Sequence, residues 1–425
     1  MKTTKLFLSL IVICLLLTDC TYDENTLLIE DLPQNQQQFN QKQSNSIMPV
    51  KSKNVLIIEY GKSTGENIKS YLRDKYDIVK YETCDCSNKR IEKWEFPVGT
   101  EIEGRKEDLA QEGGVEGTEY QLFYQNENTT LSNNNITQNI SLISSYIKPI
   151  NTDATIAILD TGIDINKLQI KDPFLYNNSA NTSLCDDEEN PEIIGWDFVN
   201  HDNNPFDDNG HGTIITDILK SKLDGDGFSD YQILPVKVFN DLGKGNTFDI
   251  LCGYLYAVDK PEVSLINMSF GWYHYPSHLL SKFIAENPNI LHITSAGNHN
   301  INNDITKHFP SSIPHSNVLA VGSYGIKQVN NDQKVFKSDF SNYGFTSVDF
   351  LSKGENISFY NPETNDYITV DGTSYAAPRV TAIAMEYFSE GYELPNQMIQ
   401  QLYLNATLLE DANELPVKFF DRIIQ

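Results

Sequence analysis

The chain has 425 residues, of which 40% are hydrophobic and 11% aromatic, so it can form packed cores and global disorder is excluded. Against 32 Lys and Arg stand 58 Asp and Glu, which gives a formal net charge of -26. A nucleic-acid binder needs a basic face, and an anionic membrane surface repels an acidic chain, so both classes of protein are disfavoured. At roughly 150 residues per domain, two or three folded units are expected.

Residues 1–20 predict an export signal. Two lysines precede an apolar run from Leu6 to Leu17, which is shorter than the about 20 residues that a membrane-spanning helix needs. A charged start, a short apolar run and a polar exit are typical of a secretory signal peptide. The segment 17–20 resembles a bacterial lipobox, which would lipidate Cys20 and tether the protein to the outer face of the cell membrane, although Asp19 departs from the small residue usual there. The alternative is simple secretion without an anchor.

Two polar segments divide the rest of the chain. Residues 21–50 are rich in Gln and Asn, cannot bury enough apolar surface to fold, and are expected to be a tether. Between 99 and 139 the composition turns to Gly, Glu and Asn, which predicts an exposed, cleavable linker.

The region 51–130, which includes part of this linker, is expected to form a small α+β domain. A strand pattern at 54–60 is followed by an amphipathic stretch at 64–74 and an alternating apolar run at 76–81. A further strand is expected near 120–124.

In the region 131–425, apolar strands alternate with helical stretches. This alternation predicts an α/β fold, in which a mostly parallel sheet is covered by helices on both faces. Ligands of such sheets bind at the carboxyl ends of the strands. The expected strands are 154–159, 232–239, 263–268, 290–295 and 318–322, and the expected helices are 211–222, 247–259, 277–286 and 374–389.

Three polar residues stand where a strand ends or a helix begins. Asp160 ends an apolar strand, His211 lies between two glycines at a helix start, and Ser374 opens the last long helix. Taken singly, a loop carboxylate, a surface histidine and a serine cap are the simpler interpretations. Together they meet the needs of nucleophilic catalysis, because serine is a weak nucleophile until a histidine takes its proton, and a buried carboxylate fixes the histidine tautomer. The order Asp, His, Ser is one of three known solutions to that geometry.

A fourth segment ends another strand in the small residues Ala296 and Gly297 and an amide, Asn298. Asn298 can donate an N–H to a developing oxyanion, and a plain turn residue is the alternative. The start of the helix at Ser374 also aims backbone N–H groups at that charge.

These four segments resemble the signature blocks of the subtilisin-like serine proteases, or subtilases, over roughly residues 140–425. The resemblance implies a three-layer α/β fold in which Asp160 orients His211, His211 acts as general base and acid, Ser374 is the nucleophile and Asn298 belongs to the oxyanion hole. Ile214–Asp217 depart from the usual sequence after the histidine, and Tyr375, Ala377 and Arg379 replace the usual Met, Ser and His. The substrate contacts that the resemblance implies are Ser269, Phe270, Gly271, Ala296, Gly297 and His308.

The resemblance further implies a secreted serine endopeptidase that processes itself, with the domain at 51–130 as an intramolecular inhibitor. The general organisation, without further C-terminal modules, resembles bacterial proteases that remove leader peptides from lanthipeptide precursors. A catalytically idle surface lipoprotein that uses the fold as a binding module is the alternative, and the presence of all four site residues argues against it.

His308 precedes an aromatic–Pro pair, and the resemblance places it near the floor of the pocket for the side chain before the scissile bond. His308 can be cationic and Lys307 stands beside it, so we expect a preference for Glu, then Gln or Asn, at that position of the substrate. The alternative is that both side chains face solvent.

No cofactor is expected for the chemistry. The acidic loop at 186–189, with Asp202, Asp207 and Asp208, is suited to hold a structural calcium ion, and Asp224–Gly227 is a second candidate. A solvated acidic surface is the alternative. None of the six cysteines has zinc-ligand spacing, and export would permit a disulfide between Cys185 and Cys252.

Overall fold

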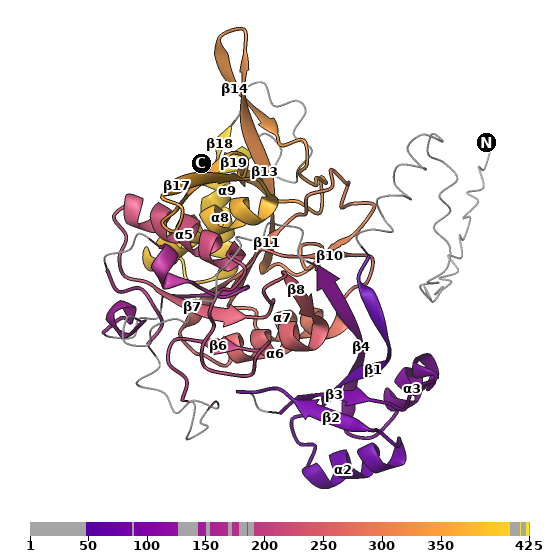
Figure 1. Ribbon diagram of the computed structural model, residues 1–425. Helices are drawn as coiled ribbons and strands as arrows, with labels where there is room; N and C mark the ends of the chain where they lie inside the picture. The colour runs from indigo at the N-terminus through magenta and orange to yellow at the C-terminus, as the bar shows by residue number, and fades with distance from the viewer. Residues whose placement is uncertain are drawn as a thin grey trace, which may run out of the picture. The chain divides into compact units, whose positions relative to one another are not determined.

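The computed structural model describes residues 48–86, 89–125, 143–149, 154–168, 172–177, 185, 191–408, 417 and 422–424 (Figure 1). The expected signal peptide, nearly all of the tether and residues 126–139 of the expected linker lie outside the described residues. Within the part of the chain that is described, no helix is long and apolar enough to cross a membrane.

The N-terminal domain is an antiparallel sheet with two helices against one face. In the sheet, β1 lies between β3 and β4, and β2 pairs with the other edge of β3. The side chains of Leu56 and Ile58 pack with Trp94 and with Leu72 and Leu109 of the helices in one buried cluster. The elements are β1 (Val50–Tyr60), α2 (Glu66–Lys75), β2 (Lys80–Thr83), β3 (Ile91–Glu95), α3 (Ile102–Leu109) and β4 (Val115–Gln125).

The expected α+β domain is therefore present, and it is larger than its sequence pattern indicated. The stretch 99–118, which we assigned to the linker, forms α3 and the start of β4. Ile102 and Leu109 bury one face of this short helix, and its charged residues account for the polar composition. The part of the expected linker that is not in this domain is 126–139, which lies outside the described residues.

A mostly parallel sheet forms the middle layer of the second domain. Its strand order is β18-β19-β15-β13-β11-β9-β5-β7-β6, and β14 adds to β13 as an antiparallel hairpin. The strand pairs β11–β9, β9–β5 and β5–β7 are all parallel. The bounds are β5 (Thr155–Asp160), β6 (Trp196–Asp197), β7 (Gln232–Lys237), β9 (Val263–Met268), β11 (Leu291–Ser295), β13 (Val318–Val329), β14 (Asp332–Lys337), β15 (Phe350–Lys353), β18 (Thr407–Leu408) and β19 (Arg422–Ile424).

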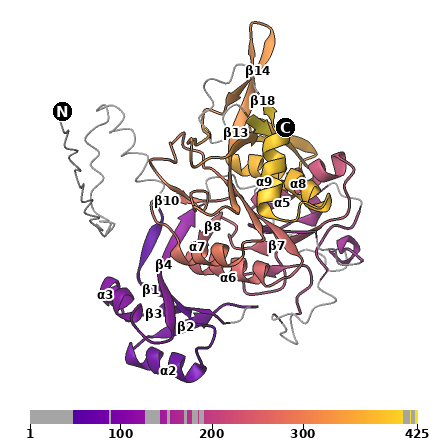
Figure 2. The ribbon, with the colours of Figure 1, turned by 180° about the vertical axis from the view of Figure 1, so that it is seen from behind.

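Helices cover both faces of this sheet, which confirms the predicted three-layer α/β fold (Figures 1 and 2). Along β5, Ile156 and Ile158 share a buried cluster with α5 and α8, whereas Ala157 and Leu159 share another with α6 and α7. Alternate residues of one strand thus serve two cores, as expected for a sheet buried on both sides. The helices are α5 (His211–Gly225), α6 (Thr247–Val258), α7 (His278–Glu286), α8 (Thr373–Ser389) and α9 (Pro395–Asn405).

Short strand pairs complete the second domain. β10 (Trp272–Tyr273) pairs with β12 (His308–Phe309), and β16 (Ile357–Asn361) pairs with β17 (Asp366–Val370). β8 (Lys244–Asn246) instead pairs with β4 of the N-terminal domain, so one sheet runs across the boundary between the two domains.

Two disulfides also cross that boundary. Cys84 is bonded to Cys252 on α6, and Cys86 is bonded to Cys185. The disulfide between Cys185 and Cys252 that we considered is therefore wrong, because each of these cysteines has a partner in the N-terminal domain. Cysteine connectivity depends on which segments meet in the fold, and sequence spacing does not supply it.

Candidate active site

Asp160 and His211 are held together in the interior of the second domain. Asp160 is the last residue of β5 and His211 is the first residue of α5. Asp160 Oδ1 and His211 Nδ1 are 2.7 Å apart, and both side chains are at most 1% exposed. A carboxylate in this position accepts the Nδ1–H proton, so the neutral imidazole keeps its lone pair on Nε2.

Asp207 fixes the first turn of α5, on which His211 lies. Its Oδ1 accepts the N–H of Gly210 at 2.7 Å, and its Oδ2 accepts the N–H of Thr213 at 2.8 Å. We had grouped Asp207 with a calcium loop, but its buried carboxylate is used to satisfy backbone donors at this helix start. Its neighbour Asp208 pairs with Lys237 at 2.6 Å.

The electrostatics of His211 suit it to accept a proton. Burial opposes the charged imidazolium, but the charge of Asp160 and its hydrogen bond outweigh burial, so the pKa of His211 is raised. Its Nε2 is buried and makes no hydrogen bond to any residue that the structure describes.

Ser374 lies at the start of α8, between Thr373, which contacts Asn298, and Tyr375, which packs against His211. It is the second residue of the helix and is 3% exposed. Ser269 Oγ donates to the backbone oxygen of Ser374 at 2.9 Å. The ring of the next residue, Tyr375, packs against His211 with 5.5 Å between the ring centroids. Tyr375, which departs from the usual family sequence, is thus a direct neighbour of the histidine.

The orientation of the Asn298 amide follows from its contacts with α8. Asn298 Oδ1 accepts the N–H of Thr373 at 2.8 Å and its hydroxyl at 2.9 Å. The N–H of Gly297 donates to the same hydroxyl at 3.1 Å. Because the amide oxygen faces Thr373, the NH₂ group of Asn298 points away from Thr373.

The expected substrate-binding residues Gly271, Gly297 and His308 come together around one imidazole. A Cβ on Gly271 would lie 2.1 Å from His308 Cε1, and a Cβ on Gly297 would lie 3.0 Å from His308 Cδ2. Gly297 also has a φ of +101°, which strains other residues. These two glycines therefore permit the His308 ring to lie between their segments.

Two residues that the sequence did not single out support this arrangement. The Tyr273 ring packs edge-on against His308 at 4.8 Å, and its hydroxyl contacts His299 Nδ1 at 3.1 Å. Asn342 Nδ2 donates to that hydroxyl at 2.8 Å and to the Ala296 oxygen at 2.9 Å. Tyr273 and Asn342 lie far from the motifs along the chain and have no local signature, so folding alone reveals their role.

The expectation that His308 can be cationic is wrong for this structure. Burial lowers the pKa of His308 to about 3, so the imidazole is neutral near pH 7. Solvent exposure, the alternative, is also wrong for His308, which is 3% exposed. Solvent exposure is found for Lys307, whose exposed Nζ contacts Ser347 Oγ at 3.1 Å.

The candidate calcium residues do not form a metal site in the part of the chain that is described. No group of three or more His, Cys, Asp or Glu side chains there could hold a metal ion. Asp224 and Asp226 instead pair with Lys220 and Lys222. The loop at 186–189 lies outside the described residues.

A sheet covered on both faces, with an Asp–His pair and a serine gathered where its elements end or begin, is the arrangement of the subtilisin-like class. A family model described as the subtilase family matches residues 151–420. Because this match covers more than half of the chain, the chain belongs to the subtilase family of subtilisin-type serine endopeptidases.

Curated relatives match the same domain. Thermitase of Thermoactinomyces vulgaris is 30% identical over 249 residues, which cover 57% of this chain and 77% of thermitase. The thermophilic serine proteinase of Bacillus sp. (strain AK1) is 31% identical over 56% of this chain and 52% of its own length. The cell wall-associated protease of Bacillus subtilis (strain 168) is 28% identical over 59% of this chain. The chain spans only 25% of that protease and about half of the thermophilic proteinase.

A solved structure extends the likeness in fold beyond the catalytic domain. The epidermin leader peptide processing serine protease of Staphylococcus aureus aligns with 88% of this chain and 98% of its own, with a TM-score of 0.57. Its sequence identity is 16%, so this likeness concerns the fold.

Proposed function

We propose that this protein is a secreted, self-processing serine endopeptidase that hydrolyses peptide bonds through an acyl-enzyme. The observation that carries the proposal is the buried 2.7 Å contact between Asp160 and His211. The ring of Tyr375, the residue after Ser374, packs against the same imidazole. In a subtilase fold, this arrangement activates a serine hydroxyl.

The mechanism uses four side chains. His211 Nε2 takes the hydroxyl proton of Ser374 as the oxygen attacks the substrate carbonyl, and then gives it to the leaving amine. Asp160 holds the imidazole and stabilises the imidazolium, consistent with the raised pKa of His211. The Asn298 NH₂ group and the backbone N–H groups at the start of α8 stabilise the oxyanion. Water then releases the acyl group by the same steps.

The N-terminal domain is suited to act as an intramolecular inhibitor, because the end of its last strand reaches the residue that follows the expected substrate edge at 269–271. Phe123–Gln125 of β4 pair antiparallel with β8. The Tyr124 ring stacks on Trp272, which follows the edge segment 269–271, with 4.4 Å between centroids. A chain that occupies this edge blocks an extended substrate that would add to it as a strand.

Side chains of the same strand accept backbone N–H groups at the starts of two helices in the catalytic domain. Glu119 Oε2 accepts the N–H of Leu279 on α7 at 2.8 Å. Gln121 Oε1 accepts the N–H of Phe248 on α6 at 3.1 Å. These helix starts would otherwise present unpaired donors, so the contacts stabilise the docked inhibitor.

For the substrate, we propose an exported peptide precursor whose leader is removed. What supports this role is the organisation that the sequence indicates, an export segment and a small domain before a subtilase domain, together with the fold shared with the epidermin leader peptide processing protease. We also propose export, with Cys20 as the lipid anchor of a membrane-tethered form. The mass of the mature N-terminus distinguishes a lipidated Cys20 from a secreted chain.

His308 changes the proposed preference for the residue before the cut. Ser311 Oγ donates to the His308 oxygen at 2.9 Å, so it accepts the proton of His308 Nδ1 at 2.8 Å. This network assigns the remaining lone pair to Nε2, which lies against Gly271. A neutral acceptor favours a side chain that donates, so we now propose Gln or Asn ahead of Glu.

No step of this mechanism uses a cofactor. A structural calcium ion at the acidic loop 186–189 remains a proposal. If calcium binds there, a chelator should lower the unfolding temperature, and added calcium should restore it.

The test compares the wild-type protein with Ser374→Ala on a peptide library, with mass spectrometry of the products and N-terminal sequencing of the protein. We expect the wild type to cut peptides and itself, the latter between residues 126 and 142, and Ser374→Ala to remain an uncut precursor. A folded wild-type protein that cuts neither would favour the binding-module alternative.

A further inference from the structure

Both disulfides connect residues that lie on opposite sides of the proposed processing segment. Cys84 and Cys86 precede residues 126–142, whereas Cys185 and Cys252 follow them. A cut anywhere in 126–142 therefore leaves the two pieces joined by two covalent bonds. All four cysteines are buried, and an exported protein meets an oxidising environment in which such bonds persist.

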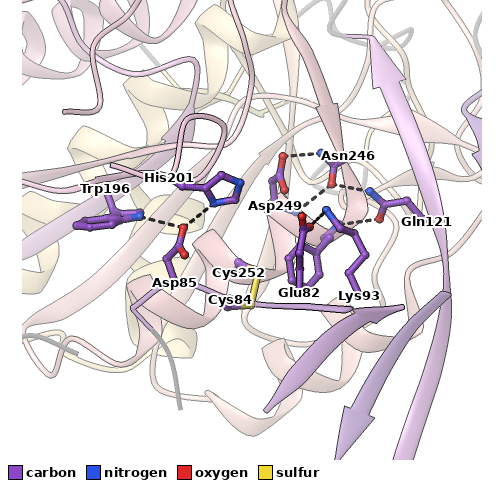
Figure 3. Close-up of a disulfide and its surroundings, with 11 residues drawn as sticks. Glu82, Cys84, Asp85, Lys93, Gln121, Trp196, His201, Asn246, Asp249 and Cys252 are labelled. Carbon is purple, nitrogen blue, oxygen red and sulfur yellow. Dashed lines mark hydrogen bonds and ion pairs between the residues drawn. A yellow bond between two sulfur atoms is a disulfide. The ribbon is translucent and has the colours of Figure 1, made fainter. Parts of the chain in front are cut away.

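The surroundings of the bridge between Cys84 and Cys252 are built from both domains (Figure 3). Asp85 lies between Cys84 and Cys86 in the sequence. Its carboxylate contacts His201 Nδ1 at 2.7 Å and accepts a hydrogen bond from Trp196 Nε1 at 3.4 Å. Lys93 contacts Glu82 and lies over the Phe248 ring of α6 at 4.9 Å. Specific polar contacts thus place the cysteines opposite their partners.

A second set of ion pairs holds the domains together near α7. Arg90 Nη1 contacts Glu286 at 2.6 Å, and Lys282 Nζ contacts both Glu59 and Glu116 at 2.9 Å. The end of β4 pairs with β8 through three residue pairs, and its side chains also contact Thr247, Leu242 and Trp272. None of these contacts is an ion pair or a covalent bond, so the end of β4 can separate while the disulfides and ion pairs keep the rest of the domain in place.

We propose that the N-terminal domain is retained after processing as a covalently attached second chain, and that substrate competes with its tethered strand end, which pairs with β8. This proposal rests on the proposed function, because it concerns a self-processing enzyme. A tethered segment has an effective concentration on the order of millimolar, independent of how dilute the enzyme is. Inhibition in the retained state is therefore intramolecular.

Release of the domain requires reduction of both bridges by a dithiol. At each bridge the S–S bond breaks and two thiols form, while the dithiol gives up two electrons and two protons and becomes a disulfide. One remaining bridge suffices for retention. A thiol reductant should therefore convert the retained state into the released state without cutting another peptide bond.

The first experiment does not depend on self-processing. A recognition sequence for a site-specific protease is placed between residues 126 and 142 of the Ser374→Ala protein, and the purified protein is cut and denatured. We expect one species without reductant and two with it, and two species in both conditions for Cys84→Ser/Cys86→Ser. The proposal is overturned if the two pieces of the protein that keeps all four cysteines separate without reductant. It is also overturned if Cys84 and Cys252 are alkylated as free thiols.

The second experiment measures specific activity of the processed wild-type enzyme on dilution. Intramolecular inhibition predicts no change across a roughly 100-fold dilution, followed by an increase of about tenfold once a dithiol is added. The single variants Cys84→Ser and Cys86→Ser, each with one bridge, are the matched controls and should behave as the wild type. Specific activity that rises on dilution while the bridges are intact contradicts the tethered competition. A protein that is inactive in all conditions but passes the first experiment rejects the proposed function and leaves retention standing.

Discussion

The two helix pairs on either side of the sheet differ in what completes their first turns. On one face, Asp207 accepts a backbone N–H at the start of α5, and Asn298 accepts one at the start of α8. Both residues belong to the catalytic domain itself. On the other face, α6 and α7 are capped by Asn246 and Ser277 of the catalytic domain, and their starts also receive Gln121 and Glu119 from the N-terminal domain. The residues proposed for chemistry therefore lie on self-supported elements, whereas the opposite layer has an additional, detachable support.

This difference suggests that catalysis and inhibition can be altered separately. Residues around His211 and Ser374 should change the turnover of bound substrate. Residues of β4 should change how firmly the N-terminal domain stays docked. The following four predictions test this separation, beginning with the largest effect.

Replacing Ser374 with Ala should lower turnover by about 10⁶, the size of the effect known from subtilisin itself, while the fold stays intact. No other group in the proposed mechanism forms the acyl-enzyme. Hydrolysis kinetics and thermal unfolding measure the two quantities. Ordinary hydrolysis by the folded variant would reject the assignment of Ser374, and altered docking of the N-terminal domain would break the proposed separation.

Replacing Asn298 with Ala should lower turnover by about 10²–10³ with little effect on KM, a magnitude that also comes from the corresponding donor in subtilisin. Asn298→Asp is the matched control, because it keeps the oxygen that Thr373 contacts and removes the NH₂ donor. Both variants should therefore lose turnover. If Asn298→Asp keeps wild-type turnover, Asn298 acts only through its contact with α8.

Docking of the N-terminal domain should weaken as the pH rises from about 6 to about 8, by up to about tenfold per pH unit for each proton released. Burial raises the pKa values of Glu119 and Asp249 to about 7, and the hydrogen bond that His201 donates to Asp85 raises the pKa of His201. All three groups hold a proton more strongly when docked, so the docked state is favoured below these raised values and loses stability as the pH rises through them. Calorimetry on the nicked Cys84→Ser/Cys86→Ser variant, in which the pieces can separate, measures the affinity.

Glu119→Gln is the control for this pH dependence, since the amide keeps an acceptor for the Leu279 N–H and cannot ionise. Its affinity should fall less steeply with pH than that of the parent variant. An unchanged slope would show that Glu119 does not take part in this linkage.

The smallest expected effect concerns specificity. Matched peptides with Gln or Asn before the cut should have a several-fold higher kcat/KM than peptides with Glu, because a neutral Nε2 acceptor rewards a donor by about 1 kcal/mol. His308→Gly should abolish this difference. Faster cleavage after Glu than after Gln would restore our first expectation of a charged imidazole.

The sequence predicted the elements whose packing is encoded in their own apolar pattern. The strand Val263–Met268 has the expected bounds, and α5 and α8 begin within one residue of expectation. Asp160, His211, Ser374 and Asn298 could be selected because each lies at the end of such an element. The structure shows the contact of Asp160 with His211 directly, and it links Asn298 and His211 to the two neighbours of Ser374 in the chain.

Features that depend on contacts between distant segments were not predictable in the same way. The strand Lys244–Asn246 carries no apolar signal, because it is held by main-chain pairing with β4. The short strand Ile91–Glu95 and the helix Ile102–Leu109 are rich in charged residues, some of which pair across the surface. The neutral state of His308 follows from burial, which composition does not encode.

Because β8 pairs with β4 through its main chain, a substrate that replaced β4 would be selected by the shape of its backbone as much as by its side chains. A strand edge can accept any segment that is free to extend, but it rejects one whose own N–H and C=O groups are already used in a helix or hairpin, or whose path is bent into a small ring. If substrate takes the place of Phe123–Gln125, the enzyme should cut linear stretches and spare folded or cross-linked ones. A precursor would then be protected by its own structure at every bond except those in its unfolded leader.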